Sequence, residues 1–265
     1  MALSRHDELI DQGLAFALAV CAEAGDILRE IRGRGNVAVD GKDGFELVTD
    51  ADLAVDRLFR ERIAQTFKDH AVLSEEGGDS GNSSKALCWV VDPLDGTANF
   101  VHGHDHVAVS AALRIDGVSV LGVVHAPFQG QTFWAVAGRG AYRNGQRITA
   151  SSLADVRRAL IGTGFPHHRT RIDEVVDRLK PLLREFGDIR RLAAPALDIC
   201  WVADGRLTGF IDRIREWDVA AAGLIATEAG ARMTMLEPAD GEGDDGTDYL
   251  IAAPGIFERL RAVLR

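Results

Sequence analysis

Residues 89–100 read Trp89-Val90-Val91-Asp92-Pro93-Leu94-Asp95-Gly96-Thr97-Ala98-Asn99-Phe100. The apolar run 87–91 that leads into them has the length of a buried strand. Because Pro93 cannot donate a hydrogen bond to a sheet, we expect this strand to stop at Asp92. A tight turn would then direct the carboxylates of Asp92 and Asp95 and the carbonyl of Leu94 toward one point. That all-oxygen ligand set is the one that magnesium prefers.

Gly96 and Thr97 follow this turn where a helix could begin. Backbone N–H groups at the start of a helix bind anions, because they have no partner within the helix. The pattern therefore predicts that a metal ion and a phosphate group meet within a few residues of one another.

Length and composition limit the classes of protein to consider. At 265 residues, the chain can bury a large core as one domain or two halves. Hydrophobic residues make up 46% and aromatic residues 6%, so we expect an aliphatic core. The net charge is −10, and no basic run marks a nucleic-acid surface, so we expect no nucleic-acid partner. An acidic protein that binds phosphate would need a metal to offset the repulsion.

The three cysteines, Cys21, Cys88 and Cys200, are far apart in the sequence. This pattern favours reduced thiols in a cytoplasmic protein over a disulfide framework or a zinc site. The chain shows neither a leader-like N-terminus nor an apolar run of about eighteen residues, so we expect no membrane partner.

Residues 89–100 also match, at every fixed position, the motif WVVDPLDGTxNF of the inositol monophosphatase family, which the chain therefore resembles. A second family motif, WDxAAxxxxxxEAG, is matched by Trp217-Asp218-Val219-Ala220-Ala221 through Glu228-Ala229-Gly230. A third, an acidic pair after a short strand, is matched by Glu75-Glu76. The motifs occur in family order and cover nearly the whole chain.

The resemblance implies a fold and an assembly. The fold is α/β, a five-layer α-β-α-β-α sandwich. Residues 1–265 would form a single domain, with a metal and phosphate half over about 1–150 and a substrate-pocket half over about 151–265. The active site would lie between the halves. A homodimer is implied by resemblance alone.

The resemblance also assigns roles to residues of this chain. Mg²⁺, as two or three ions per site, would be held by Glu75, Asp92, Leu94, Asp95 and Asp218. Phosphate would be bound by Asp95, Gly96, Thr97 and Asp218, and catalysis would involve Asp52, Thr97 and Glu75. The implied reaction is hydrolysis of a phosphomonoester by metal-activated water, with inhibition by lithium.

Asp52 carries two interpretations. The pattern Thr49-Asp50-Ala51-Asp52 predicts a capping box ahead of a helix that extends to about Phe67. Spacing alone would make Asp52 a helix-start carboxylate, whereas the resemblance pairs it with Thr97. We expect Asp50 to be an ordinary carboxylate facing the helix dipole.

Histidines and a lysine near these motifs leave alternatives open. Three histidines occupy every second position, at His102, His104 and His106. They could bind a transition metal, lie near the substrate, or form ordinary hydrogen bonds, and we favour the last. Lys42, in a glycine-rich loop, either reaches the metal site, as the resemblance implies, or is solvated.

The part that would bind the alcohol of the substrate departs from the family pattern. Ala193-Ala194-Pro195 stands where inositol phosphatases have glycine and small residues. Ile211, with Asp212 next to it, stands where they have a glutamate that binds a substrate hydroxyl. Overall length and motif spacing nevertheless favour a small polyol phosphate, inositol 1-phosphate first, as the substrate. The alternatives are histidinol phosphate, 3′-phosphoadenosine 5′-phosphate, fructose 1,6-bisphosphate, and a regulatory binding role without catalysis.

Overall fold

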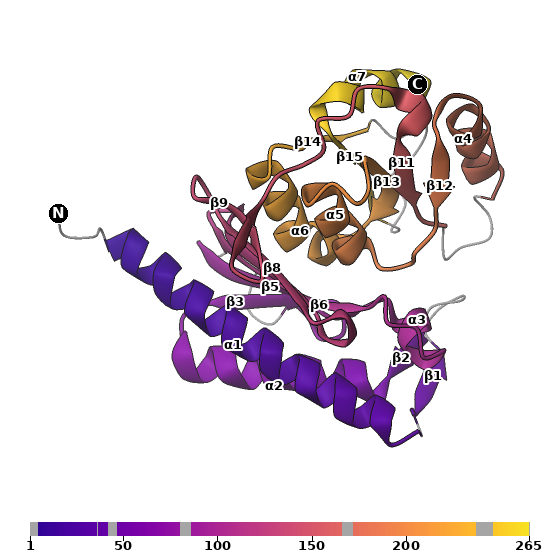
Figure 1. Ribbon diagram of the computed structural model, residues 1–265. Helices are drawn as coiled ribbons and strands as arrows, with labels where there is room; N and C mark the ends of the chain where they lie inside the picture. Colours follow the sequence, from indigo (N-terminus) through magenta and orange to yellow (C-terminus); the bar gives the residue numbers. More distant parts are fainter. Residues whose placement is uncertain are drawn as a thin grey trace.

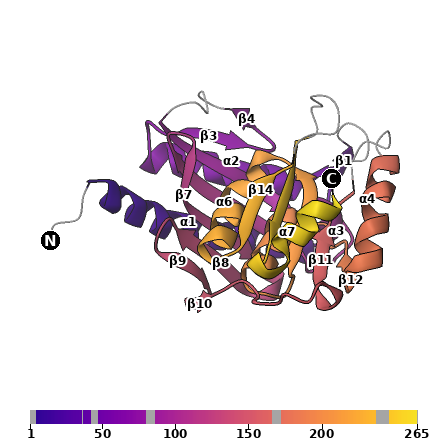
Figure 2. The ribbon, with the colours of Figure 1, turned by 90° about the horizontal axis from the view of Figure 1, so that it is seen from above.

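The computed structural model describes residues 5–35, 37–41, 47–79, 86–165, 172–236 and 246–264, and these form five alternating layers (Figure 1). Helices α1 and α2 cover one face of an eight-stranded sheet, and α5 and α6 cover its other face. A five-stranded sheet lies on the far side of α5 and α6, and α4 and α7 close the sandwich (Figures 1 and 2). The predicted α-β-α-β-α architecture is confirmed. The division of residues 1–265 into halves of one domain near residue 150 stays a prediction.

The elements have the following bounds. The helices are α1 (Arg5–Gly33), α2 (Asp50–Thr66), α3 (Thr97–Val101), α4 (Ile172–Glu185), α5 (Pro195–Ala203), α6 (Glu216–Glu228) and α7 (Pro254–Val263). The strands are β1 (Val39–Gly41), β2 (Leu47–Thr49), β3 (Ala71–Ser74), β4 (Gly78–Asp79), β5 (Leu87–Asp95), β6 (Ala108–Ile115), β7 (Val118–Ala126), β8 (Gln131–Val136), β9 (Gly140–Arg143), β10 (Gln146–Ile148), β11 (Leu160–Thr163), β12 (Asp188–Arg190), β13 (Gly209–Ile214), β14 (Arg232–Met235) and β15 (Thr247–Ala252). Across the described residues, no helix combines the length and the apolar character that a bilayer-spanning segment needs.

The eight-stranded sheet is built around β5. Its strand order is β10-β9-β8-β7-β6-β5-β3-β4, with β5 parallel to β3 and antiparallel to β6. Successive side chains of a strand point to opposite faces. Trp89 and Val91 accordingly pack with α1 and α2, whereas Cys88 and Val90 pack with α5 and α6. Because both faces are covered, the strand is apolar along its whole buried length.

Strand β5 does not stop at Asp92, so that prediction was wrong. Asp92 pairs with Ser110, and the pairing resumes with Asp95 opposite Ala108. One more residue separates the two positions on β5 than on β6, which defines a bulge. Pro93 lies within this bulge, where its missing N–H costs no ladder hydrogen bond. The bulge, and not the end of the strand, directs Asp92 and Asp95 out of the sheet.

The five-stranded sheet has the order β12-β11-β13-β15-β14. Strand β13 lies at its centre, parallel to β11 and antiparallel to β15. Phe210 and Ile214 face the α5–α6 layer, and Ile211 packs with α4 and α7 on the opposite face. The two-residue period places Asp212 on the same face as Phe210 and Ile214.

Helix α6 approaches the eight-stranded sheet closely at Gly122 of β7. A Cβ atom at this position would lie 2.7 Å from the Ala221 Cα and 2.9 Å from its carbonyl oxygen. Because backbone atoms cannot rotate away as a side chain does, only glycine fits here.

We expect Gly122→Ala to cost about 1–3 kcal/mol of unfolding free energy, because the added methyl group would push α6 away from the sheet. Gly33→Ala is the matched control, since a Cβ there meets nothing within 4 Å. Urea denaturation of both variants measures the difference. Equal stability of Gly122→Ala and the wild type would contradict the close packing of α6.

Candidate active site

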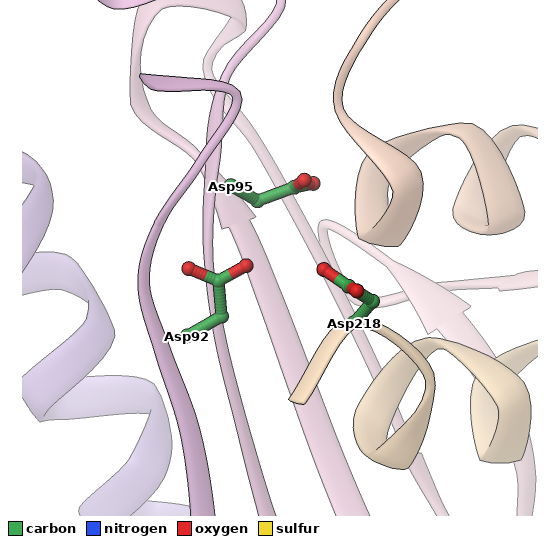
Figure 3. Close-up of side chains that lie close together, drawn as sticks. All are labelled: Asp92, Asp95 and Asp218. Atoms are coloured by element: carbon green, nitrogen blue, oxygen red, sulfur yellow. The ribbon is translucent and has the colours of Figure 1, made fainter. Parts of the chain in front are cut away.

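Three carboxylates converge where the α5–α6 layer meets β5. Asp92 and Asp95 project from the bulge of β5, and Asp218 lies in the first turn of α6 (Figure 3). One oxygen from each carboxylate lies within 4.8 Å of the others. Asp92 and Asp95 are only 1% and 2% exposed. The structure therefore brings together three of the acidic residues that the sequence selects.

Each of these carboxylates accepts a hydrogen bond from one backbone N–H group. Asp92 Oδ1 accepts from Leu94 at 3.0 Å, and Asp218 Oδ2 accepts from Arg215 at 2.7 Å. Asp95 Oδ2 accepts from Leu197, in the first turn of α5, at 2.9 Å. The second oxygen of Asp95, Oδ1, is buried without a hydrogen-bond partner in the part of the chain that the structure describes. A buried oxygen of this kind is costly unless something binds it.

The electrostatics of the group favour a cation. Burial raises the pKa of Asp92 well above its ordinary value, and the charges of Glu75, Asp95 and Asp218 raise it further. Burial likewise raises the pKa of Asp95, and the charge of Asp218 adds to the shift. A divalent cation among the oxygens would remove this cost, and magnesium prefers carboxylate oxygens. The residues present therefore fit a hard divalent metal ion.

Glu75 and the carbonyl of Leu94 lie beside this group. Glu75 follows β3 and lines the same cavity, outside the group of three but near enough to influence the pKa of Asp92. Leu94 also lines the cavity, and its carbonyl oxygen lies 3.2 Å from Thr97 Oγ1. Lys42 lies outside the described residues.

Asp52 joins the cap of α2 to the active site. Its Oδ2 accepts from the Thr49 N–H at 2.8 Å, and Thr49 Oγ1 accepts from the Asp52 N–H, which completes the predicted capping box. Its Oδ1 lies 3.1 Å from Thr97 Oγ1. Burial raises the pKa of Asp52. The two interpretations of Asp52 are thus compatible, because each uses a different oxygen. Asp50 is exposed, as expected.

The carboxylates line a cavity of about 390 Å³. Gly96 and Thr97 lie on its wall beside them. Gly96 has a φ of 93°, and a Cβ there would come within 3.2 Å of the carbonyl oxygens of His106 and Ala193. Glycine is therefore required for the chain to turn from β5 into α3.

The opposite wall explains two departures from the family pattern. Pro195 is in the first turn of α5, where a missing N–H removes no helical hydrogen bond. Ile211 points away from the cavity into the core under α4 and α7, whereas Asp212 lines the cavity. A Cβ at Gly164 would collide with the Asp212 carboxylate, so the glycine leaves room for it. Burial raises the pKa of Asp212 to about 7.

His106, Asp198 and Glu228 each have a hydrogen-bond partner that is distant in the sequence. His106 Nε2 lies 2.7 Å from Asp198 Oδ1, which supports the hydrogen-bonding interpretation, while His102 and His104 are exposed. Asp198 was missed in the sequence because nothing local signals a partner 92 residues away. Glu228 of the second motif accepts the N–H groups of Gly138 and Gly140 at 2.7 and 2.8 Å, so it holds a turn of the sheet.

Comparison with known proteins finds a matching family, related sequences and the same fold. The model of the inositol monophosphatase family matches residues 9–263. The putative Nus factor SuhB of Neisseria meningitidis serogroup B is 35% identical over 256 residues, which cover 95% of this chain and 97% of that protein. The inositol-1-monophosphatase of Mycobacterium bovis is 35% identical over 272 residues, covering 98% and 91%.

Solved structures agree. The extragenic suppressor protein suhB from Bartonella henselae superposes with a TM-score of 0.87 at 28% identity, covering 96% of this chain and 98% of that chain. The IMPase of Thermotoga maritima gives a TM-score of 0.84 at 30% identity, covering 96% of each chain.

We expect Mg²⁺ to stabilise the folded protein, because the ion relieves repulsion among Asp92, Asp95 and Asp218. At a concentration about a hundredfold above the dissociation constant, binding adds about 2.7 kcal/mol, which raises the melting temperature by about 5–10 °C. Thermal unfolding in Mg²⁺ and in EDTA at equal ionic strength measures the shift. Asp92→Asn should reduce it, whereas Asp50→Asn should preserve it.

The size of this shift should increase with pH. The folded-state pKa values of Asp92 and Asp95 are raised above the ordinary value of 3.8. Stability from these groups is therefore fully present below about pH 4 and is lost as pH rises through the raised values. Mg²⁺ restores it, so the Mg²⁺-induced shift should be larger at pH 8 than at pH 5. A shift independent of pH would contradict this origin.

Proposed function

The chain belongs to the inositol monophosphatase family, and we propose that it is a Mg²⁺-dependent phosphomonoesterase that hydrolyses a small phosphorylated polyol such as inositol 1-phosphate. The convergence of Asp92, Asp95 and Asp218 in a cavity beside the Asp52–Thr97 pair carries this proposal. Family membership supports phosphatase activity in general, and the substrate is part of the proposal.

The oxygen donors of the site would hold the metal. Two or three Mg²⁺ ions would be bound by Glu75, Asp92, Leu94, Asp95 and Asp218, with Leu94 contributing its carbonyl oxygen. When bound, such ions stabilise charge on the phosphoryl and leaving oxygens and lower the pKa of the attacking water. Inhibition by lithium would follow from competition for a magnesium position.

Thr97 and Asp52 would position the attacking water and receive its proton. A hydroxyl group has one donor and two acceptor sites. When Thr97 Oγ1 donates to Asp52 Oδ1, its lone pairs can accept a hydrogen bond from water. As the water attacks phosphorus, its proton passes to Thr97 Oγ1, and the threonine proton passes to Asp52. The raised pKa of Asp52 makes this carboxylate a better proton acceptor than an ordinary aspartate.

The phosphate would be held at the turn after β5. Gly96 and Thr97 lie at the start of α3, where the backbone N–H groups have no partner within the helix. These groups can donate to phosphoryl oxygens and stabilise the charge that accumulates on them in the transition state. Asp95 and Asp218 would act on the phosphate through the metal.

A second candidate function is binding to a transcription complex. Several relatives are named Nus factor SuhB, including that of Pasteurella multocida at 34% identity over 82% of each chain. Such a role would not depend on buried carboxylates, so protein carrying Asp95→Asn would retain it. The cluster therefore favours catalysis as the primary function. We further expect a homodimer located in the cytoplasm, without a nucleic-acid partner of its own.

Asp95→Asn should lower kcat by about a thousandfold or more, because it removes one charge from the metal-binding group and leaves the shape unchanged. Phosphate release in Mg²⁺ and in EDTA measures this on inositol 1-phosphate, histidinol phosphate, 3′-phosphoadenosine 5′-phosphate and fructose 1,6-bisphosphate. Asp50→Asn is the matched control and should retain wild-type turnover. Mg²⁺-dependent turnover of Asp95→Asn near the wild-type rate would exclude the ligand assignment.

Thr97→Ala should lower kcat by about 10²–10⁴-fold, while Thr97→Ser, which keeps the hydroxyl, should stay within about tenfold of the wild type. Asp52→Asn combined with Thr97→Ala should cost little more than Thr97→Ala alone, since both residues act on the same proton. Steady-state kinetics of these variants tests the relay. Additive losses in the double variant would show that the two residues act separately.

A further inference from the structure

The cavity extends beyond the carboxylates to a second wall rich in arginine. Arg178 of α4, Arg191, Arg213 of β13 and Arg215 all line it. We propose that this wall binds a second anionic group, a phosphate or a carboxylate, on the alcohol part of the substrate. The inference rests on the proposed phosphatase function and names the class of substrate for the same site.

Arg178 and Arg213 converge on Asp248 of β15. Arg178 Nη1 donates to one oxygen of Asp248 at 3.0 Å, and Arg213 Nη2 donates to the other at 3.2 Å. The Asp248 side chain is 5% exposed, and those of Arg213 and Arg178 are 14% and 25% exposed. Burial acts to raise the pKa of Asp248, but the two guanidinium groups outweigh it and lower the pKa. Asp248 is therefore ionised, and the three residues keep one positive charge in excess.

This group also has more hydrogen-bond donors than acceptors. Each guanidinium carries about five N–H donors, and Asp248 accepts one hydrogen bond from each side chain. Within the described residues neither side chain makes another hydrogen bond, and the buried Arg213 Nε has no partner at all. An anion in the cavity would accept hydrogen bonds from these half-buried, positively charged donors. Such charge-assisted hydrogen bonds are stronger than hydrogen bonds between neutral groups.

Arg191 and Arg215 add to the positive charge of the wall. Arg191 Cζ lies 5.5 Å from the ring of Phe165, and Arg215 Cζ lies 5.7 Å from the ring of Trp217. A guanidinium held by an aromatic ring keeps its N–H edge for hydrogen bonding.

Two further carboxylates share this wall, Asp212 and the exposed Glu174. Asp212 Oδ1 accepts the Arg213 N–H at 2.9 Å, and both Asp218 and Arg178 act on its charge. Asp212 is therefore close enough to both the metal-binding carboxylates and the arginines to feel their charges, and it lines the cavity, where it can accept a hydrogen bond from a hydroxyl. A substrate with phosphate at one end, hydroxyls in the middle and an anion at the other end matches this order. A cationic alcohol, such as histidinol, would meet the arginines.

Matched substrate pairs test the inference. Sorbitol 6-phosphate and 6-phosphogluconate differ by a terminal CH₂OH and carboxylate, and fructose 1-phosphate and fructose 1,6-bisphosphate differ by a second phosphate. In saturating Mg²⁺, we expect kcat/KM for the anionic member of at least one pair to exceed that of its neutral partner by about 10–100-fold, the ratio expected for hydrogen bonds to a charged group. The pair that shows the ratio identifies the anion as carboxylate or phosphate.

Arg178→Gln and Arg213→Gln should each reduce this preference about tenfold and change kcat/KM for the neutral partner by less than about threefold. A purely structural role would lower both values together. Arg259→Gln is the control, since Arg259 pairs with Glu185 on the surface. Arg178 lies on the partly exposed helix α4, so its variant keeps the test valid if Arg213→Gln fails to fold. Isothermal titration of Asp95→Asn protein with the same pairs gives the preference without turnover.

Equal kcat/KM within both pairs would overturn the inference, as would a preference that survives both arginine substitutions. Absence of Mg²⁺-dependent phosphate release from every compound would instead overturn the proposed phosphatase function. In that case, the titration with the two pairs still shows whether the arginine wall binds the second anion.

Discussion

The repulsion among Asp92, Asp95 and Asp218 is the constraint on which the rest of the structure depends. Three buried carboxylates with oxygens within 4.8 Å of one another would move apart in a flexible loop. Here each is fixed by a backbone N–H from a different place: the bulge itself, the start of α5, and the residue before α6. The energy for holding them comes from the surrounding core, because α5 and α6 are packed between two sheets. A bound cation would remove the repulsion among the three carboxylates. Because the fold holds the carboxylates in place, this relief would strengthen metal binding.

The layered fold also explains why the cavity has two different ends. The α5–α6 layer contacts both sheets, and the cavity lies where β5 of the first sheet faces β13 of the second. The first sheet and α6 supply the carboxylates. The second sheet supplies Asp212 from its face toward α5 and α6, and Arg213 and Asp248 from its face toward α4 and α7. Changes in β13 can therefore alter the alcohol end of the cavity without moving the bulge in β5.

The sequence predicts those parts of the site that depend on local pattern. The capping box at Thr49 and the acidic residues of the motifs could be read from short stretches, and the five-layer fold was implied by the family resemblance that those motifs carry. The end of β5 was predicted wrongly, because a proline that stops a ladder and a proline that occupies a bulge look the same without the partner strand. The hydrogen bonds from Leu197 to Asp95 and between His106 and Asp198 could not be predicted, because they join residues about a hundred positions apart. They depend on how α5 packs between the two sheets.

Ile211 shows how one residue of offset changes a binding site. In the family pattern a hydroxyl-binding glutamate stands at this position. Here the side chain of Ile211 packs into the core, and the carboxylate of the next residue, Asp212, lines the cavity. Because a strand alternates its faces, Asp212 lies on the face toward α5 and α6, whereas Arg213 lies on the face of Ile211, directly opposite Asp248 in the pairing of β13 with β15. The register of β13 and β15 thus places the Arg178–Asp248–Arg213 group beside Asp212 on the wall of the cavity. The cavity has carboxylates at one end and arginines at the other. This arrangement would orient an anionic polyol phosphate in one direction, with the phosphate to be cleaved toward the carboxylates and the second anion toward the arginines.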